Sequence, residues 1–462
     1  MAKPNAREVA YELLLAVATA DAYANLLLPK LISRSELDSR DAGFAQELSF
    51  GTIRNQIFYD RIIEACANRQ VGAIEPAALA VLRIGAHQLL AMRVPSHAAL
   101  SETVELAKHK LKPVLTGFIN GVLRRVSEKS REQWLTELVE AESDSVEKLS
   151  IEFSHPSWVI RALKDSLQAD GKAEQLRDLL EQDNIAPLVN LVALPGLADR
   201  DDLFDAGASL EGLSPIGAVL PSGDPAKLAV IATGKARVQD QGSQLAALAL
   251  VNASEVSDKE EWLDMCAGPG GKAALLAAEA KLQKAELVCN ELQEHRSKLV
   301  AQALKAVNPD VYIRTGDGRD LGADAPDSFD RILLDAPCSG LGALRRRPES
   351  RFRRTKADVN QLAKLQQQLL ESAFAGLKPG GVLAYVTCSP HLAETAAIVD
   401  WALRKYESQV ELLDARAILG KVSPQILETL PDRKTVQLWP HIHQTDAMFI
   451  ALLQKKTNRV KA

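Results

Sequence analysis

The sequence predicts an all-α domain followed by an α/β domain with a mostly parallel sheet. Apolar residues recur at i, i+3, i+4 and i+7 through the first 128 residues, which is the helical period. Beyond Glu261, short apolar runs alternate with helical segments, as in parallel strands joined by crossover helices. A chain of 462 residues also exceeds what one hydrophobic core usually organises, so two or three domains are expected.

The N-terminal all-α domain is expected to span residues 1–128. Prolines at Val94-Pro95 and Lys112-Pro113 interrupt the helical pattern, because a residue before proline is biased away from the helical conformation. The expected helices include Ala6–Val17, Ser39–Arg54, Pro76–Met92 and His97–His109.

Residues 129–238 are expected to form a connector helix and a small α/β module. The stretch Ser130–Ser150 is polar and rich in glutamate, so it is interpreted as a solvated helix. Helical pieces are expected at Ser157–Leu167 and Ala173–Gln182, and a short strand at Leu188–Leu194.

The third domain is expected to span residues 239–456 and to contain a Rossmann-like, mostly parallel seven-stranded sheet. Its strand candidates are short and apolar, and each ends near glycine or a polar residue. They are Glu261–Met265, Glu286–Cys289, Val311–Arg314, Arg331–Asp335 and Gly381–Thr387.

The composition is that of an ordinary globular protein, with 47% hydrophobic and 25% charged residues. The net charge of −5 argues against global charge as a means of coating nucleic acid, so any such contact requires local basic patches. No signal-peptide pattern and no apolar run of membrane length is seen, so a cytoplasmic location is expected. The five cysteines are too few and too scattered for a disulfide framework, and are therefore expected to be reduced thiols.

A glycine turn follows the first strand of the third domain, in Asp-Met-Cys-Ala-Gly-Pro-Gly-Gly-Lys from Asp264 to Lys272. Ligands of doubly wound sheets lie over the carboxyl ends of strands, where glycine lets them approach the backbone. The spacing fits neither GxGxxG nor GxxxxGK[ST]. The D-x-x-x-G-x-G arrangement of Asp264, Gly268 and Gly270 instead suits a charged ligand without phosphate, such as S-adenosylmethionine.

Two further acids follow the next strands. Glu291 stands about 20 residues past the turn, where an acid can accept hydrogen bonds from ribose hydroxyls. Asp317, in Arg-Thr-Gly-Asp-Gly-Arg, could accept from an adenine amino group. Either acid alone could be a solvated loop residue, but three at successive strand ends favour a cofactor site.

Two cysteines, Cys338 and Cys388, follow the fourth and fifth strands on the same rim. A lone cysteine after a strand is more often core filler. Carbon 5 of cytosine, however, accepts a methyl group only after a nucleophile has added to carbon 6, which is a task for a thiolate. A second thiol could assist product release, and Asp335 lies in the loop where an acid could act near ring nitrogen N3.

The motifs resemble, in order along the chain, those of the bacterial 16S ribosomal RNA cytosine-5 methyltransferase B family, the Sun or Fmu proteins. The motifs are DMCAGPGGK, GDGRD, LLDAPCSG, RRRPESR and YVTCS, together with QDQGSQ at residues 239–244. Near the N-terminus, DAGFAQELSFGTIRN, VPSHAALSETVELAK and GFINGVLRR resemble the domain shared with the antitermination factor NusB. The resemblance therefore implies a NusB-like RNA-binding domain before an S-adenosylmethionine methyltransferase domain.

The resemblance also implies a role for each matching residue. Cys388 would be the nucleophile, Cys338 would release the product, and Asp335 and Pro337 would bind the target base. Glu291 would hold the ribose and Asp317 the adenine. The full cofactor set expected here is Asp264, Cys266, Ala267, Gly268, Pro269, Gly270, Gly271, Lys272, Glu291, Arg296, Asp317, Gly318 and Asp335.

Three positions depart from the family pattern. Gly268 replaces a common alanine, which should be harmless. Glu291 replaces the usual aspartate, which should shift the ribose slightly. Thr395 stands where the family has asparagine after glutamate, which leaves its role open.

A basic run follows the Cys338 loop, and seven of the twelve residues from 345 to 356 are Arg or Lys. Charge runs are usually solvated faces, but the position of this one beside the cysteine favours contacts with RNA phosphates. The expected RNA contacts are Pro337, Arg345, Arg346, Arg347 and Arg351. His441 and His443 lack a convincing set of further ligands, so no metal is expected.

The expected partner is therefore RNA, most directly small-subunit ribosomal RNA, with no membrane partner and a monomeric chain. Three alternatives stay open. The same chemistry could act on transfer RNA or another RNA, because the active-site motifs are common to such enzymes. The chain could be a non-catalytic RNA-binding or assembly factor. A nicotinamide dehydrogenase is disfavoured by the loop spacing.

Overall fold

The computed structural model of the protein describes residues 4–457 and forms two compact units. Unit 1 extends to Ala162 and also contains Asp183–Ile185 and Leu344–Arg353. Unit 2 contains Leu163–Gln182, Ala186–Ala343 and the chain from Arg354 onward. The chain therefore returns to unit 1 twice after leaving it, at Asp183 and at Leu344.

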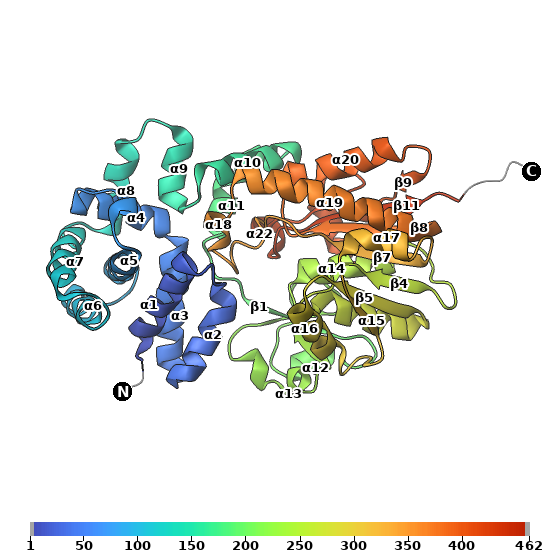
Figure 1. The fold of residues 1–462 in the computed structure, drawn as a ribbon, viewed down its shortest axis with the longest axis horizontal. Coiled ribbons are helices and arrows are strands. Elements are labelled where there is room, and N and C mark those ends of the chain that lie inside the picture. Colours follow the sequence, from blue (N-terminus) through green and yellow to red (C-terminus); the bar gives the residue numbers. More distant parts are fainter. Residues whose placement is uncertain (1–3, 458–462) are drawn as a thin grey trace, which may run out of the picture. The chain divides into compact units, whose positions relative to one another are not determined.

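Unit 1 is all-α, and Figure 1 shows its main helices, α1–α9, as a bundle. Side-chain caps begin several of them: Asn5 accepts from the backbone of Arg7 and Glu8, and Asp38 accepts from Asp41. The elements are α1 (Ala6–Thr19), α2 (Ala24–Ser35), α3 (Ser39–Arg54), α4 (Gln56–Ala67), η1 (Val71–Ala73), α5 (Pro76–Leu90), α6 (Ser96–Lys110), α7 (Pro113–Val126), α8 (Arg131–Glu140), α9 (Ser145–Phe153) and α18 (Ser350–Arg353).

The acidic connector is two helices rather than the single solvated helix that was expected. A capping box at Ser130 begins α8, and Asp144 caps α9, so the chain turns between them. Trp134 is 5% exposed and Ile151 is 3% exposed, and both pack into the core of unit 1. The glutamates therefore line the outer face of helices whose other face is buried.

Unit 2 contains a small antiparallel sheet in the order β2-β1-β3 and a larger sheet. Before and around the small sheet lie α10 (Ser157–Ala169), η2 (Ala173–Gln175), α11 (Leu176–Gln182), β1 (Val189–Ala193), α12 (Arg200–Asp205), β2 (Gly217–Leu220), η3 (Pro225–Lys227), α13 (Ala229–Ala232) and β3 (Ala236–Val238). These elements lie within residues 129–238, where a connector helix and a small α/β module were expected. None of the helices in residues 4–457 is long and apolar enough to cross a bilayer.

The larger sheet has the order β10-β11-β8-β7-β4-β5-β6, with β9 paired to β11. The five strands β8, β7, β4, β5 and β6 are parallel, and β9, β10 and β11 are joined by antiparallel pairs. Over the described residues the sheet has eight strands where seven were expected. The short strands β9 and β10 both pair with β11. The strands are β4 (Glu261–Asp264), β5 (Glu286–Glu291), β6 (Tyr312–Thr315), β7 (Phe329–Asp335), β8 (Leu377–Thr387), β9 (Val410–Leu412), β10 (Val436–Gln437) and β11 (Phe449–Lys455).

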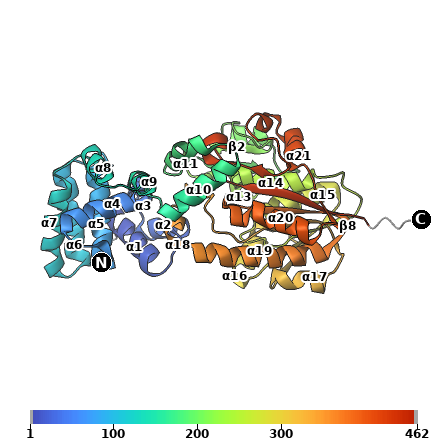
Figure 2. The ribbon, with the colours of Figure 1, turned by 90° about the horizontal axis from the view of Figure 1, so that it is seen from above.

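Helices cover both faces of this sheet, which explains why its central strands are continuous apolar runs (Figure 2). Leu333 and its same-face neighbours pack under α14 (Gln241–Val251), α15 (Gly271–Gln283), α16 (Glu294–Leu304) and α21 (Ala415–Val422). Ile332 and Leu334 face the opposite layer, made of α17 (Leu321–Asp324), α19 (Lys356–Gly376) and α20 (Ala396–Lys405). The remaining elements are η4 (Gly318–Asp320), η5 (Leu392–Glu394), η6 (Pro424–Glu428) and α22 (Pro440–His443).

Candidate active site

The candidate site lies in unit 2, at the rim where the parallel strands end. Strand β4 ends at Asp264, β5 at Glu291 and β7 at Asp335, and β8 ends one residue before Cys388. Because these strands are paired in parallel register, their carboxyl ends share one edge of the sheet. The residues singled out from the sequence are thereby brought onto one rim.

The glycine turn between β4 and α15 is closely packed against the backbone of α16. Gly270 has φ +106°, and a Cβ there would lie 2.5 Å from Ala303 Cβ and 3.1 Å from Val300 Cα. Only glycine combines this left-handed conformation with the missing volume. The turn is tied to β5 by a hydrogen bond from Ala267 N to Asn290 O, 2.9 Å. The packing against α16 and the bond to β5 therefore fix the backbone of the glycine turn at the rim.

Asp264 is a buried acid, 1% exposed, and within residues 4–457 neither of its carboxylate oxygens has a well-formed hydrogen-bond partner. Burial raises its pKa to about 7, and the neighbouring charge of Asp335 adds to the rise. A buried acid with so few hydrogen bonds is costly unless a ligand completes it. A cationic ligand group is the partner that would most favour its ionised form.

Gln239 is a second residue of this kind that sequence reasoning used only as part of a motif. It is 7% exposed, and both polar atoms of its amide lack partners among the described residues. Its side chain faces the start of α15, with Cδ 4.0 Å from where a Cβ on Gly271 would stand. Its burial, which only the fold shows, is the signal that marks it.

Glu291 binds the glycine turn directly, and this explains two departures from the family pattern together. Its Oε2 accepts from Gly268 N at 3.0 Å, and its Oε1 accepts from Gln293 N at 3.0 Å. A Cβ at position 268 would lie 2.2 Å from Oε2. The longer acid therefore occupies the space that alanine would fill, so glycine and glutamate fit as a pair. Arg296 lies beside them, with Nη2 3.6 Å from Glu291 Oε2.

Asp317 is tied to its own turn. Its carboxylate accepts from Arg319 N at 2.9 Å and from Arg319 Nε, and it caps η4. The hydrogen bonds with Arg319 hold the pKa of Asp317 below its usual value. An adenine amino group would have to share this carboxylate with Arg319.

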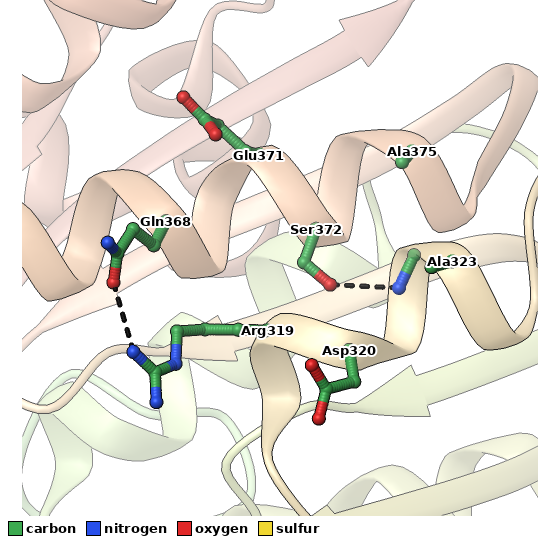
Figure 3. Close-up of a pocket in the computed structure, with 8 residues that line it drawn as sticks. Arg319, Asp320, Ala323, Gln368, Glu371, Ser372 and Ala375 are labelled. Atoms are coloured by element: carbon green, nitrogen blue, oxygen red, sulfur yellow. Dashed lines mark hydrogen bonds between the residues drawn. The ribbon is translucent and has the colours of Figure 1, made fainter.

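A shallow pocket of about 490 Å³ lies beside the same turn, between η4, α17 and α19. In Figure 3, Arg319 Nη1 reaches Gln368 Oε1, and Ser372 binds the backbone of Gly322. None of the residues lining it carries a thiol or belongs to the glycine turn. The pocket is therefore a neighbour of the expected adenine position and not the reaction centre.

Lys272 and Asp335 form an ion pair at the rim. Lys272 Nζ donates to Asp335 Oδ2 at 2.8 Å and lies 3.3 Å from Ser243 Oγ. Burial lowers the pKa of Lys272, but the charges of Asp335, Cys388 and Asp264 outweigh it and leave that pKa raised. Lys272 therefore stays a cation. The ammonium of Lys272 can therefore donate a hydrogen bond beside the expected base position.

The two thiols meet across the ends of β7 and β8, with 3.4 Å between Cys338 Sγ and Cys388 Sγ. The hydrogen bond to Cys388 raises the pKa of Cys338 well above its ordinary value, and burial adds to this. The Cys388 loop is fixed by a bond from Gly342 N to Cys388 O, 2.9 Å. Pro337 is exposed, and its carbonyl accepts from Gln366 Nε2 at 2.9 Å.

The other expected cofactor residues lie around the same turn. Burial raises the pKa of the Cys266 thiol well above its ordinary value, and the acids Asp264, Asp335 and Glu291 add to the rise. This argues against a nucleophilic role for Cys266. Gly318 is buried against Leu369 of α19.

Most of the basic run, residues 344–353, belongs to unit 1. Arg351 is fully buried and donates to Ser154 O at 3.1 Å and to Asn184 Oδ1 at 2.9 Å. Arg345 is 2% exposed, and its carbonyl accepts from Arg54 Nη2 at 3.2 Å.

The expectation that Arg345 and Arg351 contact RNA is therefore wrong for this structure, because their side chains are enclosed by protein. Arg347 is exposed and lies over the ring of Tyr23, and Arg346 is half-buried.

The two histidines near the C-terminus have protein partners. His443 Nδ1 accepts from Trp439 N at 2.8 Å, and its Nε2 pairs with Thr429 Oγ1 at 3.0 Å. His441 Nε2 pairs with Gln175 Oε1 at 3.0 Å. Burial lowers the pKa of His443 to about 4, so it is neutral at physiological pH. Among residues 4–457 no cluster of three potential metal ligands is found.

A mostly parallel sheet with helices on both faces, an acid-bearing glycine turn and strand-end acids at one rim define the class of S-adenosylmethionine-dependent methyltransferases. Residues 251–454 match the family model described as 16S rRNA methyltransferase RsmB/F, and residues 4–128 match the NusB family. The chain belongs to the RsmB/F methyltransferase family and carries a NusB-family domain, which confirms the resemblance and the fold class predicted from the sequence.

Three similar proteins align with this chain over nearly their whole length. A Mycobacterium tuberculosis protein named as a methyltransferase, without a stated substrate, is 45% identical over 98% of this chain and 97% of its own. The ribosomal RNA small subunit methyltransferase B of Enterobacter sp. is 32% identical over 99% of this chain and 100% of its own. The crystal structure of PH0851 covers 98% of this chain and 99% of its own, with a TM-score of 0.79 at 20% identity, which shows a shared fold.

Proposed function

We propose that this protein transfers the methyl group of S-adenosylmethionine to carbon 5 of a cytosine in small-subunit ribosomal RNA, through a covalent cysteine adduct. The observation that carries the proposal is the pair of thiols, 3.4 Å apart, on the rim that also holds the Lys272–Asp335 pair and the cofactor turn. Cytosine-5 chemistry needs a thiolate, a donor and acceptor for the base edge, and a cofactor site together.

The residues of the rim fit the cofactor. The buried carboxylate of Asp264, which has no well-formed side-chain partner, suits the amino group of the cofactor, Glu291 retains lone pairs for ribose hydroxyls, and the Gly268–Gly271 turn leaves the backbone accessible. When bound, S-adenosylmethionine supplies an electrophilic methyl group. Asp317 with Gly318 is proposed to hold the adenine side, and Cys266, Ala267, Pro269 and Arg296 to shape the turn.

The Lys272–Asp335 pair matches the edge of a cytosine. The edge presents an acceptor at N3 and donors on the N4 amino group, and the pair offers an ammonium and a carboxylate 2.8 Å apart. We propose that Asp335 accepts from the amino group and that Lys272 donates toward N3 as electron density grows there. Pro337, exposed beside Cys338, would pack against the base.

Cys388 is proposed as the nucleophile. Lys272 interacts electrostatically with Cys388, which favours a thiolate, whereas Cys338 holds its proton. The Cys388 sulfur bonds to carbon 6, and carbon 5 then carries the electron pair that forms its bond to the methyl group. Loss of the carbon-5 proton to a base returns an electron pair to the ring. That pair reforms the 5,6 double bond and expels the Cys388 sulfur, which takes a proton from Cys338 and leaves as a thiol, so that Cys338 becomes the thiolate.

Several observations support ribosomal RNA as the substrate and the cytoplasm as the place of action. Relatives that align over nearly the whole chain are named for the small ribosomal subunit, and the NusB-family domain accompanies the catalytic unit here. A base must be unstacked to bring carbon 6 to a thiol, so a cytosine in a loop is the expected target.

Bisulfite sequencing of ribosomal and transfer RNA from cells with and without the gene tests this proposal. Loss of one protected cytosine in small-subunit ribosomal RNA, restored by the wild-type gene but not by Cys388→Ala, is the expected result. Loss of a transfer RNA signal instead would reassign the substrate. Unchanged RNA would support a non-catalytic assembly role.

A further inference from the structure

Glu394, at the end of η5, is fully buried and joins the two cysteine loops. Its Oε1 accepts from Ser339 N at 2.8 Å, and its Oε2 accepts from Ser339 Oγ at 2.6 Å and from Ser389 Oγ at 2.7 Å. Ser339 directly follows Cys338, and Ser389 directly follows Cys388. One carboxylate therefore fixes the residue after each thiol.

The polar groups that surround Glu394 donate hydrogen bonds to it. Gln366 Nε2 donates to its Oε1 at 3.2 Å, and Tyr385 donates to Gln366 Oε1 at 3.1 Å and to the Glu394 carbonyl at 2.7 Å. Within residues 4–457 no Lys or Arg forms an ion pair with Glu394, so hydrogen bonds alone hold its charge. Charge-assisted bonds of this kind are stronger than neutral ones, and a buried carboxylate persists only when fully bonded.

The charge of Glu394 acts on one thiol, and the charge of Lys272 acts on the other. The pKa of Cys338 is raised first by the bond to Cys388, then by burial and the charge of Cys388, then by Glu394, while the backbone of Gly340 opposes the rise. Tyr385, whose own pKa is raised by burial, and His391 are the other titratable groups that face this carboxylate. Lys272 faces Cys388 from α15.

We propose that Glu394 is a positioning residue: its carboxylate holds the two cysteine loops in register through Ser339 and Ser389, and its negative charge beside the Cys338 loop disfavours an anion on the Cys338 sulfur. This rests on the proposed cytosine-5 chemistry for its purpose. Because Glu394 reaches the thiols through Ser339 and Ser389, it need not touch the RNA.

The test is the rate at which iodoacetamide alkylates Cys338 in the full-length protein, followed by mass spectrometry of its peptide across pH 6 to 10. In Glu394→Gln we expect about tenfold faster alkylation of Cys338 near pH 8, because loss of a nearby anion frees the thiolate. Cys289, which is fully buried in the sheet, should stay unreactive and so reports that the fold is intact.

Two further variants separate charge from geometry. Glu394→Asp keeps the charge but is too short to bridge both serines, so Cys338 should alkylate slowly while methyl transfer falls at least tenfold in kcat, with the KM for S-adenosylmethionine unchanged. Glu260→Gln is the matched control, since Glu260 is a buried acid before the start of β4, bonded to Arg331 and Trp262. It should change stability without changing the alkylation of Cys338.

If Glu394→Gln does not fold, Ser339→Ala and Ser389→Ala remove one bond each and leave the carboxylate in place. An unchanged alkylation profile of Cys338 in a folded Glu394→Gln, or equal kcat in Glu394→Asp and wild type, would overturn the proposal. Alkylation needs neither RNA nor methyl transfer, so its outcome is independent of whether the protein methylates cytosine. A wild type that alkylates as expected but methylates no RNA would instead refute the proposed function.

Discussion

Cys338 and Cys388 occupy equivalent places, each just beyond the carboxyl end of a neighbouring parallel strand, yet their surroundings are opposite in charge. Cys338 lies in the field of the buried anion Glu394, whereas Cys388 interacts with the cation of Lys272. Their sulfur atoms are 3.4 Å apart, so the difference is established over a very short distance. Equal depth and equal chemistry at the strand ends therefore do not imply equal roles. The bond to Cys388 and burial raise the pKa of Cys338 most, and the charge of Glu394 adds to the rise.

The largest expected effect comes from removing the thiolate. Cys388→Ala should lower methyl transfer by more than about 10³-fold, because the raised pKa of the neighbouring Cys338 makes that thiol a poor replacement for the attacking thiolate. The measurement is the transfer of labelled methyl groups to small-subunit ribosomal RNA, with Cys289→Ala as the control. Retention of activity by Cys388→Ala would show that Cys388 is not the attacking thiol.

Removing the other thiol should stop the reaction at a later stage. Cys338→Ala is expected to attack the base and then accumulate a covalent protein–RNA adduct, because release is impaired while addition is not. A band of increased mass on a denaturing gel, sensitive to nuclease, checks this. The absence of any adduct, with turnover at the wild-type rate, would show that Cys338 has no part in release.

Removing the cation should make the two thiols more alike. Lys272→Met is expected to slow adduct formation by about tenfold to a hundredfold at pH 7 and to move the rate profile toward higher pH, because the Cys388 thiolate loses the positive charge that Lys272 supplies. Lys281→Met, on the same helix but bonded to Val307 O, is the matched control. A profile that stays at the same pH would mean that Lys272 acts only on the base or cofactor.

The smallest effect is expected from an exposed arginine of unit 1. Arg347→Ala removes an exposed guanidinium and should raise the KM for RNA by about two- to fivefold, with kcat and the adduct rate unchanged, as for a single phosphate contact. Initial rates at two salt concentrations check this. A fall in kcat would show that the arginine segment influences the thiols after all.

The sequence predicted most of the site because its chemistry is local. Strand ends and the glycine turn follow from short patterns, so the sequence alone places Asp264, Glu291, Asp335 and both cysteines at strand ends on one rim. The polar groups that complete the rim were not foreseen. Gln239 and Glu394 become informative only through burial, which depends on contacts with distant parts of the chain.

The basic run shows the opposite failure. Seven basic residues in twelve predicted a charged surface, but Arg351 is buried against residues 167 to 197 positions earlier in the chain. A charge pattern indicates where cations occur and not whether they are already paired. The prediction for the acidic connector failed for a related reason. Its many glutamates indicated a fully solvated helix, whereas Trp134 is buried on the other face of α8.

The chain exchange between the two units has a consequence for biosynthesis. Unit 1 includes Glu349, which accepts from Ala24 N at 3.1 Å, and Arg351. A ribosome must therefore translate past residue 353 before the N-terminal bundle can acquire its last helix. By then β4 to β7 have been made, but β8 and β11 have not. Domains usually finish folding in the order of synthesis. Here the first unit must wait for a segment encoded within the second, so a nascent chain halted before that point would carry an incomplete bundle.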